Sequence, residues 1–202
     1  MDICLTDWYI CDLILGTISG LIAGYINISA EWLSDIKEGY CSHSFYLKYK
    51  FCCQFREENC PEWISWDQNW ILGYFLFILF AVSFGLLSAL FVSNFAPYAA
   101  GSGIPEVKTI LGGFVIRNFL SLSTLSIKVV SLILAVASGM ALGKEGPLVH
   151  VACCVGQIVP CFFKKYAGNE AKRREMLSVA SATGVSVAFG APIGGVIFLH
   201  IY

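Results

Sequence analysis

Three short stretches of the sequence combine glycines with a proline, and two of them also carry a side chain that can do chemistry. They are Gly101-Ser102-Gly103-Ile104-Pro105, Gly143-Lys144-Glu145-Gly146-Pro147 and Gly190-Ala191-Pro192. Proline suits the first helical position because the N–H that it lacks has no helical partner there, and glycine lets the backbone turn close to a ligand. Each stretch therefore predicts a helix N-terminus whose free N–H groups and positive dipole end can hold an anion without a basic side chain.

The first stretch offers the fuller set of hydrogen-bond donors. The hydroxyl of Ser102 lies beside the backbone amides of Gly103 and Ile104, and the second stretch adds donors near Gly146. A single motif of this kind is usually a turn followed by a helix. Two of them in short apolar segments, one with a serine and one with a carboxylate, predict an anion site.

Glu145 has two interpretations. As an exposed turn residue beside Lys144 it would have no role in binding. It directly precedes a predicted helix N-terminus in a hydrophobic stretch, however, and an ionisable residue inside a membrane segment is by default a functional hypothesis. Its carboxylate can occupy the position of a bound anion, and protonation would release it. Glu145 would thereby couple a proton to the movement of an anion.

Other chemistry is not supported by the sequence. The run from Gly139 to Glu145 resembles a P-loop, but its glycine spacing is one residue short and Glu145 stands where the Mg²⁺-binding hydroxyl should be. His150 with Cys153 and Cys154 does not have a zinc-site spacing. Because no Ser/His/Asp set is identifiable either, we expect no enzymatic activity, no metal and no organic cofactor.

The composition predicts an integral membrane protein. Hydrophobic residues make up 57% of the chain and charged residues 13%, which is about half the ~25% charge of soluble domains. Eleven of the 27 charged residues lie between Glu31 and Asp67, and seven more lie between Lys164 and Glu175. A net charge of −1 leaves no basic surplus for a nucleic-acid partner.

The apolar segments predict an all-α, multi-pass fold. Trp8–Ile28 and Trp70–Ala96 are long enough to cross a bilayer, which takes about 20 helical residues. Val129–Leu142 and Pro147–Phe163 are shorter, and Gly190 and Pro192 interrupt the last apolar segment, Met176–Tyr202. We therefore expect two spanning helices followed by broken, re-entrant helices, whose non-helical backbone is tolerated only where it lines a cavity.

The two charged windows predict the topology. By the positive-inside rule, the basic loop 164–175 is cytoplasmic and the loop 31–69 is extracytoplasmic or lumenal. That outer loop holds Cys41, Cys52, Cys53 and Cys60, which an oxidising compartment could pair. The sequence leaves the three possible pairings open.

The sequence resembles the CLC family of chloride channels and chloride/proton exchangers in three runs, GSGIPEVKTIL (101–111), GKEGPLVH (143–150) and GAPIGG (190–195). It is most similar to the eukaryotic endosomal and lysosomal exchanger branch in VKTILGGFVIR, HVACC and KRRE…GVSVAFGAPIGG. By the family pattern, Ser102 matches the central chloride-binding serine and Glu145 the gating glutamate. The resemblance implies chloride and protons as the transported ions, a homodimer with one anion pathway in each subunit, and an endosomal, lysosomal or plasma membrane.

The resemblance covers the first of the family's two inverted halves. The second-half chloride-site motif, its facing tyrosine and the nucleotide-binding CBS pair have no counterpart in residues 1–202, and Ile201 and Tyr202 stand where the exchangers carry a glutamate pair. We therefore expect a partial CLC transmembrane domain, which leaves open a fragment, a splice product and an incomplete gene model. The expected function is chloride/proton exchange. The alternatives are a passive voltage-gated chloride channel and a non-transporting truncated form that assembles with or regulates full-length subunits.

Overall fold

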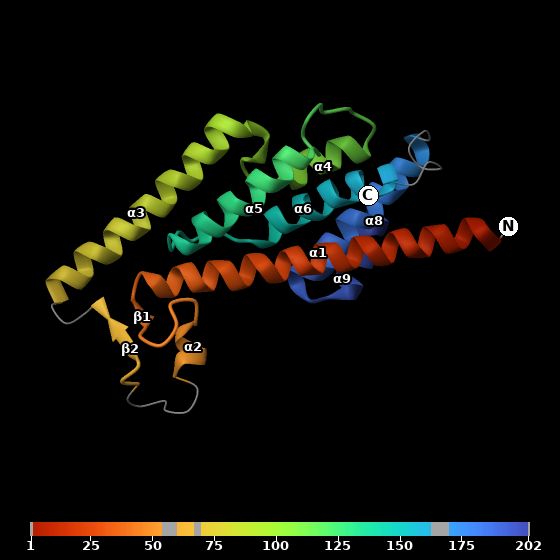
Figure 1. The fold of residues 1–202 in the computed structure, drawn as a ribbon. Helices are drawn as coiled ribbons and strands as arrows, with labels where there is room; N and C mark the ends of the chain where they lie inside the picture. The colour runs from red at the N-terminus through yellow and green to blue at the C-terminus, as the bar shows by residue number, and fades with distance from the viewer. Residues whose placement is uncertain (1, 54–59, 67–69, 163–169, 202) are drawn as a thin grey trace. The chain divides into compact units, whose positions relative to one another are not determined.

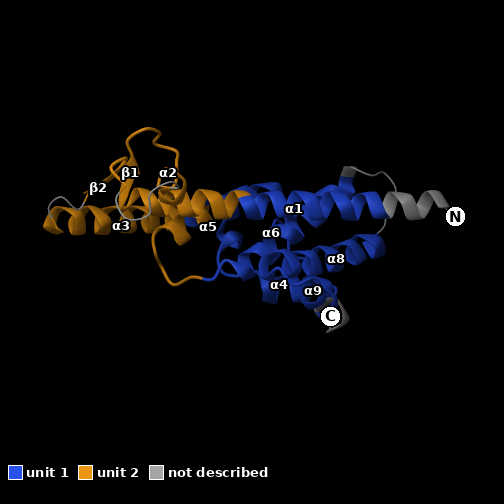
Figure 2. Cartoon of the chain, turned by 90° about the horizontal axis from the view of Figure 1, so that it is seen from below, with its two compact units in different colours: residues 1–24, 91–130, 143–202 blue, residues 25–90, 131–142 orange. Residues whose placement is uncertain are grey.

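The computed structural model describes residues 2–53, 60–66, 70–162 and 170–201. Its contacts separate the chain into two compact units, which are coloured separately in Figure 2. Unit 1 comprises Met1–Gly24, Phe91–Val130 and Gly143–Tyr202, and unit 2 comprises Tyr25–Leu90 and Ser131–Leu142. Every predicted site residue therefore belongs to unit 1.

Two long apolar helices match the two predicted spans. They are α1 (Asp2–Ile36) and α3 (Trp70–Phe95), drawn in Figure 1. Within them, stretches of 28 and 26 residues have the length and hydropathy of a membrane crossing. α3 exposes large apolar side chains along its length, as expected of a helix whose solvent is lipid. The sequence prediction of two spanning helices is thus confirmed at the level of length and composition.

The first helix continues past the predicted boundary at Ile28. It includes the first six residues of the predicted outer loop. The prediction placed the boundary too early because charged residues indicate where the chain meets water, and a helix can continue into water. Interactions with the outer loop stabilise this last part of α1. Lys48 forms an ion pair with Glu31 at 2.5 Å, and the indole N–H of Trp32 donates to the Phe45 carbonyl oxygen at 3.1 Å.

The outer loop in unit 2 contains two short strands that the all-α prediction missed. β1 (Gly39–Cys41) pairs antiparallel with β2 (Trp63–Ser65), and Tyr40 lies opposite Ile64. Strands of three residues are too short to show a recognisable alternation in the sequence. The other regular elements of the described residues are helices, and the short helix α2 (Tyr49–Cys52) lies in the same loop.

Disulfides select one of the three possible cysteine pairings in the outer loop. Cys41 is bonded to Cys52, and Cys53 is bonded to Cys60. The sulfur atoms of Cys52, Cys53 and Cys60 lie within 4.8 Å of one another, but all three are held in disulfides and are not free to bind a metal. The two bridges close short loops and tie the α2 segment to β1. Residues 54–59 and 67–69 of the predicted loop lie outside the described part of the chain.

Shorter helices follow α3, as the broken apolar segments predicted. They are η2 (Pro97–Ala99), α4 (Ile104–Leu111), α5 (Leu122–Ala137), α6 (Glu145–Ile158), η3 (Val159–Phe162), α8 (Glu170–Phe189) and α9 (Pro192–Ile201). α4 has 8 residues and α6 has 14, too few to cross a hydrocarbon core of about 30 Å at about 1.5 Å per residue. Their re-entrant course stays a prediction.

The predicted break at Gly190 and Pro192 is present. α8 ends at Phe189, Gly190 has a φ of 62°, and α9 begins at Pro192. Residues 170–175 of the predicted basic loop form the start of α8 and are therefore helical. The rest of that loop, up to residue 169, and Tyr202 lie outside the described residues.

The helix α6 forms the centre of unit 1. Its residues from Leu148 to Gly156 are all buried, and it packs along α8 (Figure 1). A Cβ added to Gly184 of α8 would lie 2.8 Å from the Cα of Val149 and 2.9 Å from the Cβ of Ala152. Glycine at this position lets the two helices approach closely, which holds α6 and its N-terminus in place.

Candidate anion-binding site

The loop before α4 places Ser102 at the start of this helix. Gly101 and Gly103 flank the serine with φ values of 70° and 78°, in the left-handed region that glycine adopts without strain. α4 begins at Ile104, so Pro105 is its second residue and not its first. The Ser102 hydroxyl oxygen lies 3.5 Å from the Ile104 backbone nitrogen and accepts its hydrogen bond. The hydroxyl hydrogen can then be donated to an anion at the positive end of the helix dipole.

The second predicted helix start, at α6, is two residues earlier than expected. α6 begins at Glu145 and not at Pro147. Proline is tolerated in this position because the N–H groups of the whole first turn lack helical acceptors. Glu145 is half-buried, and its Oε2 lies 2.8 Å from the position that a Cβ on Gly143 would take. The carboxylate thus folds back over the turn before α6, where the helix dipole favours a negative charge.

The N-termini of α4 and α6 contact each other. A Cβ added to Gly146 would lie 2.8 Å from the Cβ of Ser102 and 3.6 Å from the Cδ1 of Ile104. Real Cβ atoms essentially never approach as closely as 2.8 Å. Glycine at position 146 therefore allows the first turn of α6 to touch residues 101–103, which we call the serine loop. The structure therefore brings Ser102, Ile104 and Gly146 together, and Glu145 is the residue next to this contact.

Lys128 of α5 anchors the serine loop. Its side chain is buried, and its ammonium group donates to the carbonyl oxygens of Ala99 and Gly101 at 2.7 Å and 2.5 Å. Hydrogen bonds from a charged donor are stronger than neutral ones, and burial strengthens them further. Lys128 therefore fixes the backbone immediately before Ser102 and brings a positive charge close to the predicted anion donors.

His150 of α6 fills the space behind Gly103. It is fully buried, its ring stacks on Phe119 with centroids 4.1 Å apart, and its Nε2 lies 3.1 Å from the Phe119 carbonyl oxygen. A Cβ added to Gly103 would lie 2.6 Å from the Nδ1 of His150. Position 103 therefore requires glycine for two reasons, its positive φ and this contact, and His150 determines where the serine loop can lie.

Sequence reasoning missed both of these supporting residues. A signal for Lys128 was present, because it is a charged residue in an apolar segment and the rule that singles out Glu145 applies to it equally. The sequence carries no comparable signal for the role of His150. Its ring contacts Gly103 only because α4 and α6 pack together, and the two residues are distant in the chain.

Residues 73–200 match the family described as "Voltage gated chloride channel". The chain belongs to this family. The matched region contains all of α4, α5, α6 and α8, and with them every residue of the contact between the serine loop and α6. The resemblance of the three sequence runs to the CLC family is thereby confirmed.

The chain is similar to curated members of the voltage gated chloride channel family. It is 54% identical over 203 residues to H(+)/Cl(−) exchange transporter 5 of Homo sapiens, a match that covers 92% of this chain and 25% of the relative. It is 51% identical over 210 residues to H(+)/Cl(−) exchange transporter 3 of Pongo abelii, covering 96% of this chain and 26% of the relative. The chain therefore spans about a quarter of the length of these curated relatives.

A solved member of the family supports the fold. The structure superposes on the crystal structure of a eukaryotic CLC transporter with a TM-score of 0.76 and 27% sequence identity. The superposition covers 98% of this chain and 33% of that chain. The predicted helical, CLC-type architecture is confirmed, with the short strand pair in the outer loop as its exception.

Proposed function

We propose that this chain forms one wall of the chloride pathway of a chloride/proton exchanger, with Ser102 as an anion ligand and Glu145 as the gate. The observation that carries the proposal is the contact between the N-termini of α4 and α6 at Ser102 and Gly146, with Glu145 as the first residue of α6. The similarity to H(+)/Cl(−) exchange transporters 5 and 3 supports exchange of chloride for protons over passive conduction.

Chloride binding at this wall needs no basic side chain in contact with the ion. Removing an anion from water costs many kcal/mol unless hydrogen-bond donors replace its hydration shell. The first N–H groups of α4 and α6 have no acceptors within their helices, and both helix dipoles favour a negative charge at this end. The Ser102 hydroxyl adds a donor between the two termini, together with the amides of Gly103 and Gly146. The Ile104 amide, which donates to the Ser102 oxygen over 3.5 Å, would donate to a bound chloride in its place. Lys128 contributes positive potential through the loop that it anchors.

The gate follows from competition between two negative charges. The Glu145 carboxylate and a chloride ion are both stabilised at the N-terminus of α6, and they repel each other there. A deprotonated Glu145 would hold the place of an anion, whereas a protonated Glu145 would be neutral and free to leave it. Chloride can then replace the Glu145 side chain only when a proton binds to the carboxylate, and it is displaced again when the proton leaves. This couples the chloride flux to the proton flux.

The assembly and location belong to the same proposal. Chloride and protons are the transported ions, the lipid bilayer is the surrounding medium, and the functional unit is a homodimer or an assembly with longer CLC subunits in an endosomal, lysosomal or plasma membrane. The disulfides of the outer loop support its placement on the lumenal or extracellular side, because disulfides persist in oxidising compartments. The basic loop 164–175 would then face the cytoplasm.

The proposal is tested by grafting this chain into the human exchange transporter 5 in place of its matching segment. The purified graft, in liposomes, is expected to move chloride and protons in opposite directions with a fixed ratio. Gly146→Ala is expected to abolish the chloride flux because its Cβ would collide with Ser102, whereas Gly16→Ala meets nothing within 4 Å and should transport normally.

Two results would contradict the proposed exchange. Chloride flux without any proton movement would identify a passive channel. A graft that assembles and inserts into the membrane but carries no chloride would favour a subunit that only assembles with or regulates transporting partners.

A further inference from the structure

Lys37 is buried, like Lys128, but it belongs to unit 2 and the proposed chloride wall does not use it. It follows the last residue of α1, and its side chain is only 4% exposed. A buried ammonium group costs free energy unless its charge is compensated, and within the described part of the chain Lys37 forms no ion pair. The groups around the ammonium therefore decide what the buried charge does.

Two groups of unit 2 contact the ammonium of Lys37. Its Nζ lies 4.9 Å from the centre of the Phe77 ring of α3, whose face attracts a cation. A Cβ added to Gly139 would lie 3.4 Å from the same Nζ. Gly139 comes two residues after the end of α5 at Ala137 and has a φ of 86°, so the ammonium lies at the negative end of the α5 dipole. The ring and the helix end compensate the charge, and the lysine in turn holds this turn next to α3.

The turn at Gly139 is the start of the connection that carries Glu145. Within it, the Leu142 N–H donates to the Met140 carbonyl oxygen at 2.7 Å, a tight bend over three residues. Gly143 follows directly, and the Glu145 carboxylate folds back over it. The backbone that lies beneath the carboxylate is therefore continuous with the turn that the lysine contacts.

The outer loop holds the backbone on both sides of Lys37 through Trp66. The indole N–H of Trp66 donates to the Ile36 carbonyl oxygen at 3.1 Å, and its backbone N–H donates to the Glu38 carbonyl oxygen at 3.2 Å. The ring of Trp66 also lies 5.3 Å from the ring of Tyr40. The outer loop thus fixes the backbone from which the lysine side chain extends to the turn.

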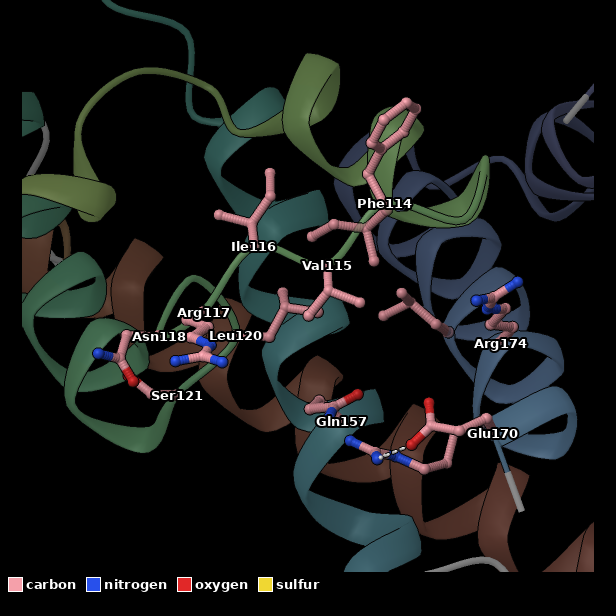
Figure 3. A pocket seen from close by; sticks show the side chains of 13 residues that line it. Phe114, Val115, Ile116, Arg117, Asn118, Leu120, Ser121, Gln157, Glu170 and Arg174 are labelled. Carbon is pink, nitrogen blue, oxygen red and sulfur yellow. Dashed lines mark hydrogen bonds and ion pairs between the residues drawn. The ribbon is translucent and has the colours of Figure 1, made fainter.

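These contacts share no residue with the cavity shown in Figure 3. That cavity has a volume of about 290 Å³ and is lined by residues of unit 1 alone, from the connection between α4 and α5, the end of α6 and the start of α8. Lys37, Phe77, Gly139 and Trp66 all belong to unit 2. The arrangement around Lys37 is therefore a separate feature of the molecule.

We propose that Lys37 is a positioning residue for the Glu145 gate and that it transmits the position of the outer loop to this gate. The inference rests on the proposed function, because it needs Glu145 to couple chloride to protons. The ammonium keeps the turn at Gly139 in one place, and the turn determines where the backbone beneath the carboxylate lies. When the turn shifts, the carboxylate closes the anion position incompletely, and chloride passes without a proton.

Lys37→Met in the graft tests the proposal, with the number of protons moved per chloride as the readout. Methionine fills a similar volume but carries no charge, so this ratio is expected to fall by about twofold or more. A loss of folded protein would lower both fluxes together and leave their ratio unchanged, so the ratio separates positioning from stability. A normal ratio in Lys37→Met would overturn the proposal.

Two further variants identify the charge of Lys37 as the cause. Lys37→Arg keeps a cation that can lie over the Phe77 ring and should retain the ratio. Lys50→Met removes the same charge from an exposed residue of α2 and should also retain it. An equal fall of the ratio in Lys37→Arg and Lys37→Met, or in Lys50→Met, would show that the buried charge does not position the gate.

Hydrogen exchange on the purified graft tests the contact with the turn without any transport measurement. The amides of Gly139 and Leu142 donate to backbone carbonyl oxygens, so their exchange reports how firmly the turn is held. Lys37→Met should speed this exchange severalfold and Lys50→Met should not, and equal rates in both would overturn the positioning role. A graft that moves no chloride or protons would contradict the proposed function, whereas the exchange rates would still decide whether Lys37 holds the turn.

Trp66→Phe tests the link to the outer loop. Phenylalanine keeps an aromatic ring beside Tyr40 but cannot donate to the Ile36 carbonyl oxygen. The ratio of protons to chloride should fall less than in Lys37→Met, and the double variant should match Lys37→Met alone, because both changes act through the same turn. Losses that add in the double variant would show that the outer loop does not act through Lys37.

Discussion

Glu145→Gln in the graft is expected to abolish proton transport while chloride still flows. Glutamine has nearly the shape of the protonated glutamic acid, but it cannot release a proton and cannot compete as an anion. The chloride site at the N-terminus of α6 would then be open at every pH. Proton flux should fall to the level of protein-free liposomes, and chloride flux should lose its dependence on the pH gradient.

A matched control separates this role from a general effect of charge. Glu106 lies in the first turn of α4, where its carboxylate also sits at a helix N-terminus but is exposed. Glu106→Gln removes the same charge and should leave the ratio of protons to chloride unchanged. Simultaneous recording of chloride efflux and internal pH checks both variants, and intact coupling in Glu145→Gln would exclude this residue as the gate.

Lys128→Met is expected to cause the second large loss, in chloride binding. Lys128 donates to the carbonyl oxygens of Ala99 and Gly101, and hydrogen bonds to charged groups contribute about 1.5–3 kcal/mol each. Methionine fills a similar volume but leaves both carbonyl groups without this donor and removes a positive charge from beside the serine loop. We expect the half-saturating chloride concentration to rise by about tenfold or more.

The control for Lys128 is an exposed lysine of the neighbouring helix. Lys108→Met in α4 removes one positive charge at the helix end opposite to Ser102, and it should leave the half-saturating chloride concentration within about twofold. Lys128→Arg retains the charge and should restore part of the affinity if it assembles. Chloride dependence of transport at fixed pH measures all three variants. A normal half-saturating concentration in Lys128→Met would show that the lysine only helps folding.

The two helix starts of the site can be predicted from the sequence, but the contact between them cannot. Glycine and proline indicate helix starts near Ser102 and Gly146 because of what these residues do to the local backbone, and both starts are present. Nothing local predicts that the two starts touch. That contact depends on the packing of α4 against α6, where Gly146 and Gly103 leave room for Ser102 and His150, and packing between distant segments has no signature in a single sequence.

The features that the sequence did not predict correctly also depend on weak local signals or on contacts between distant residues. Pro147 suggests a later start for α6, because proline is allowed anywhere in a first turn and so fixes the boundary only loosely. The pairing of Cys41 with Cys52 depends on the fold of the outer loop and not on spacing. The three-residue strands are too short for a periodic pattern, whereas Lys128 has a signal in the sequence, because it is a charged residue in an apolar segment.

The position of a bound halide shows directly whether Ser102 and the N-terminus of α6 form the chloride site. Crystals of the graft grown in bromide would give an anomalous peak for each bound ion, since bromide replaces chloride in sites made of hydrogen-bond donors. We predict a peak within hydrogen-bonding distance of the Ser102 hydroxyl and the Ile104 backbone amide, and in Glu145→Gln a further peak at the N-terminus of α6 beside Gly146. A transport-competent graft with bromide bound elsewhere in the protein and none at Ser102 would show that Ser102 is not a chloride ligand.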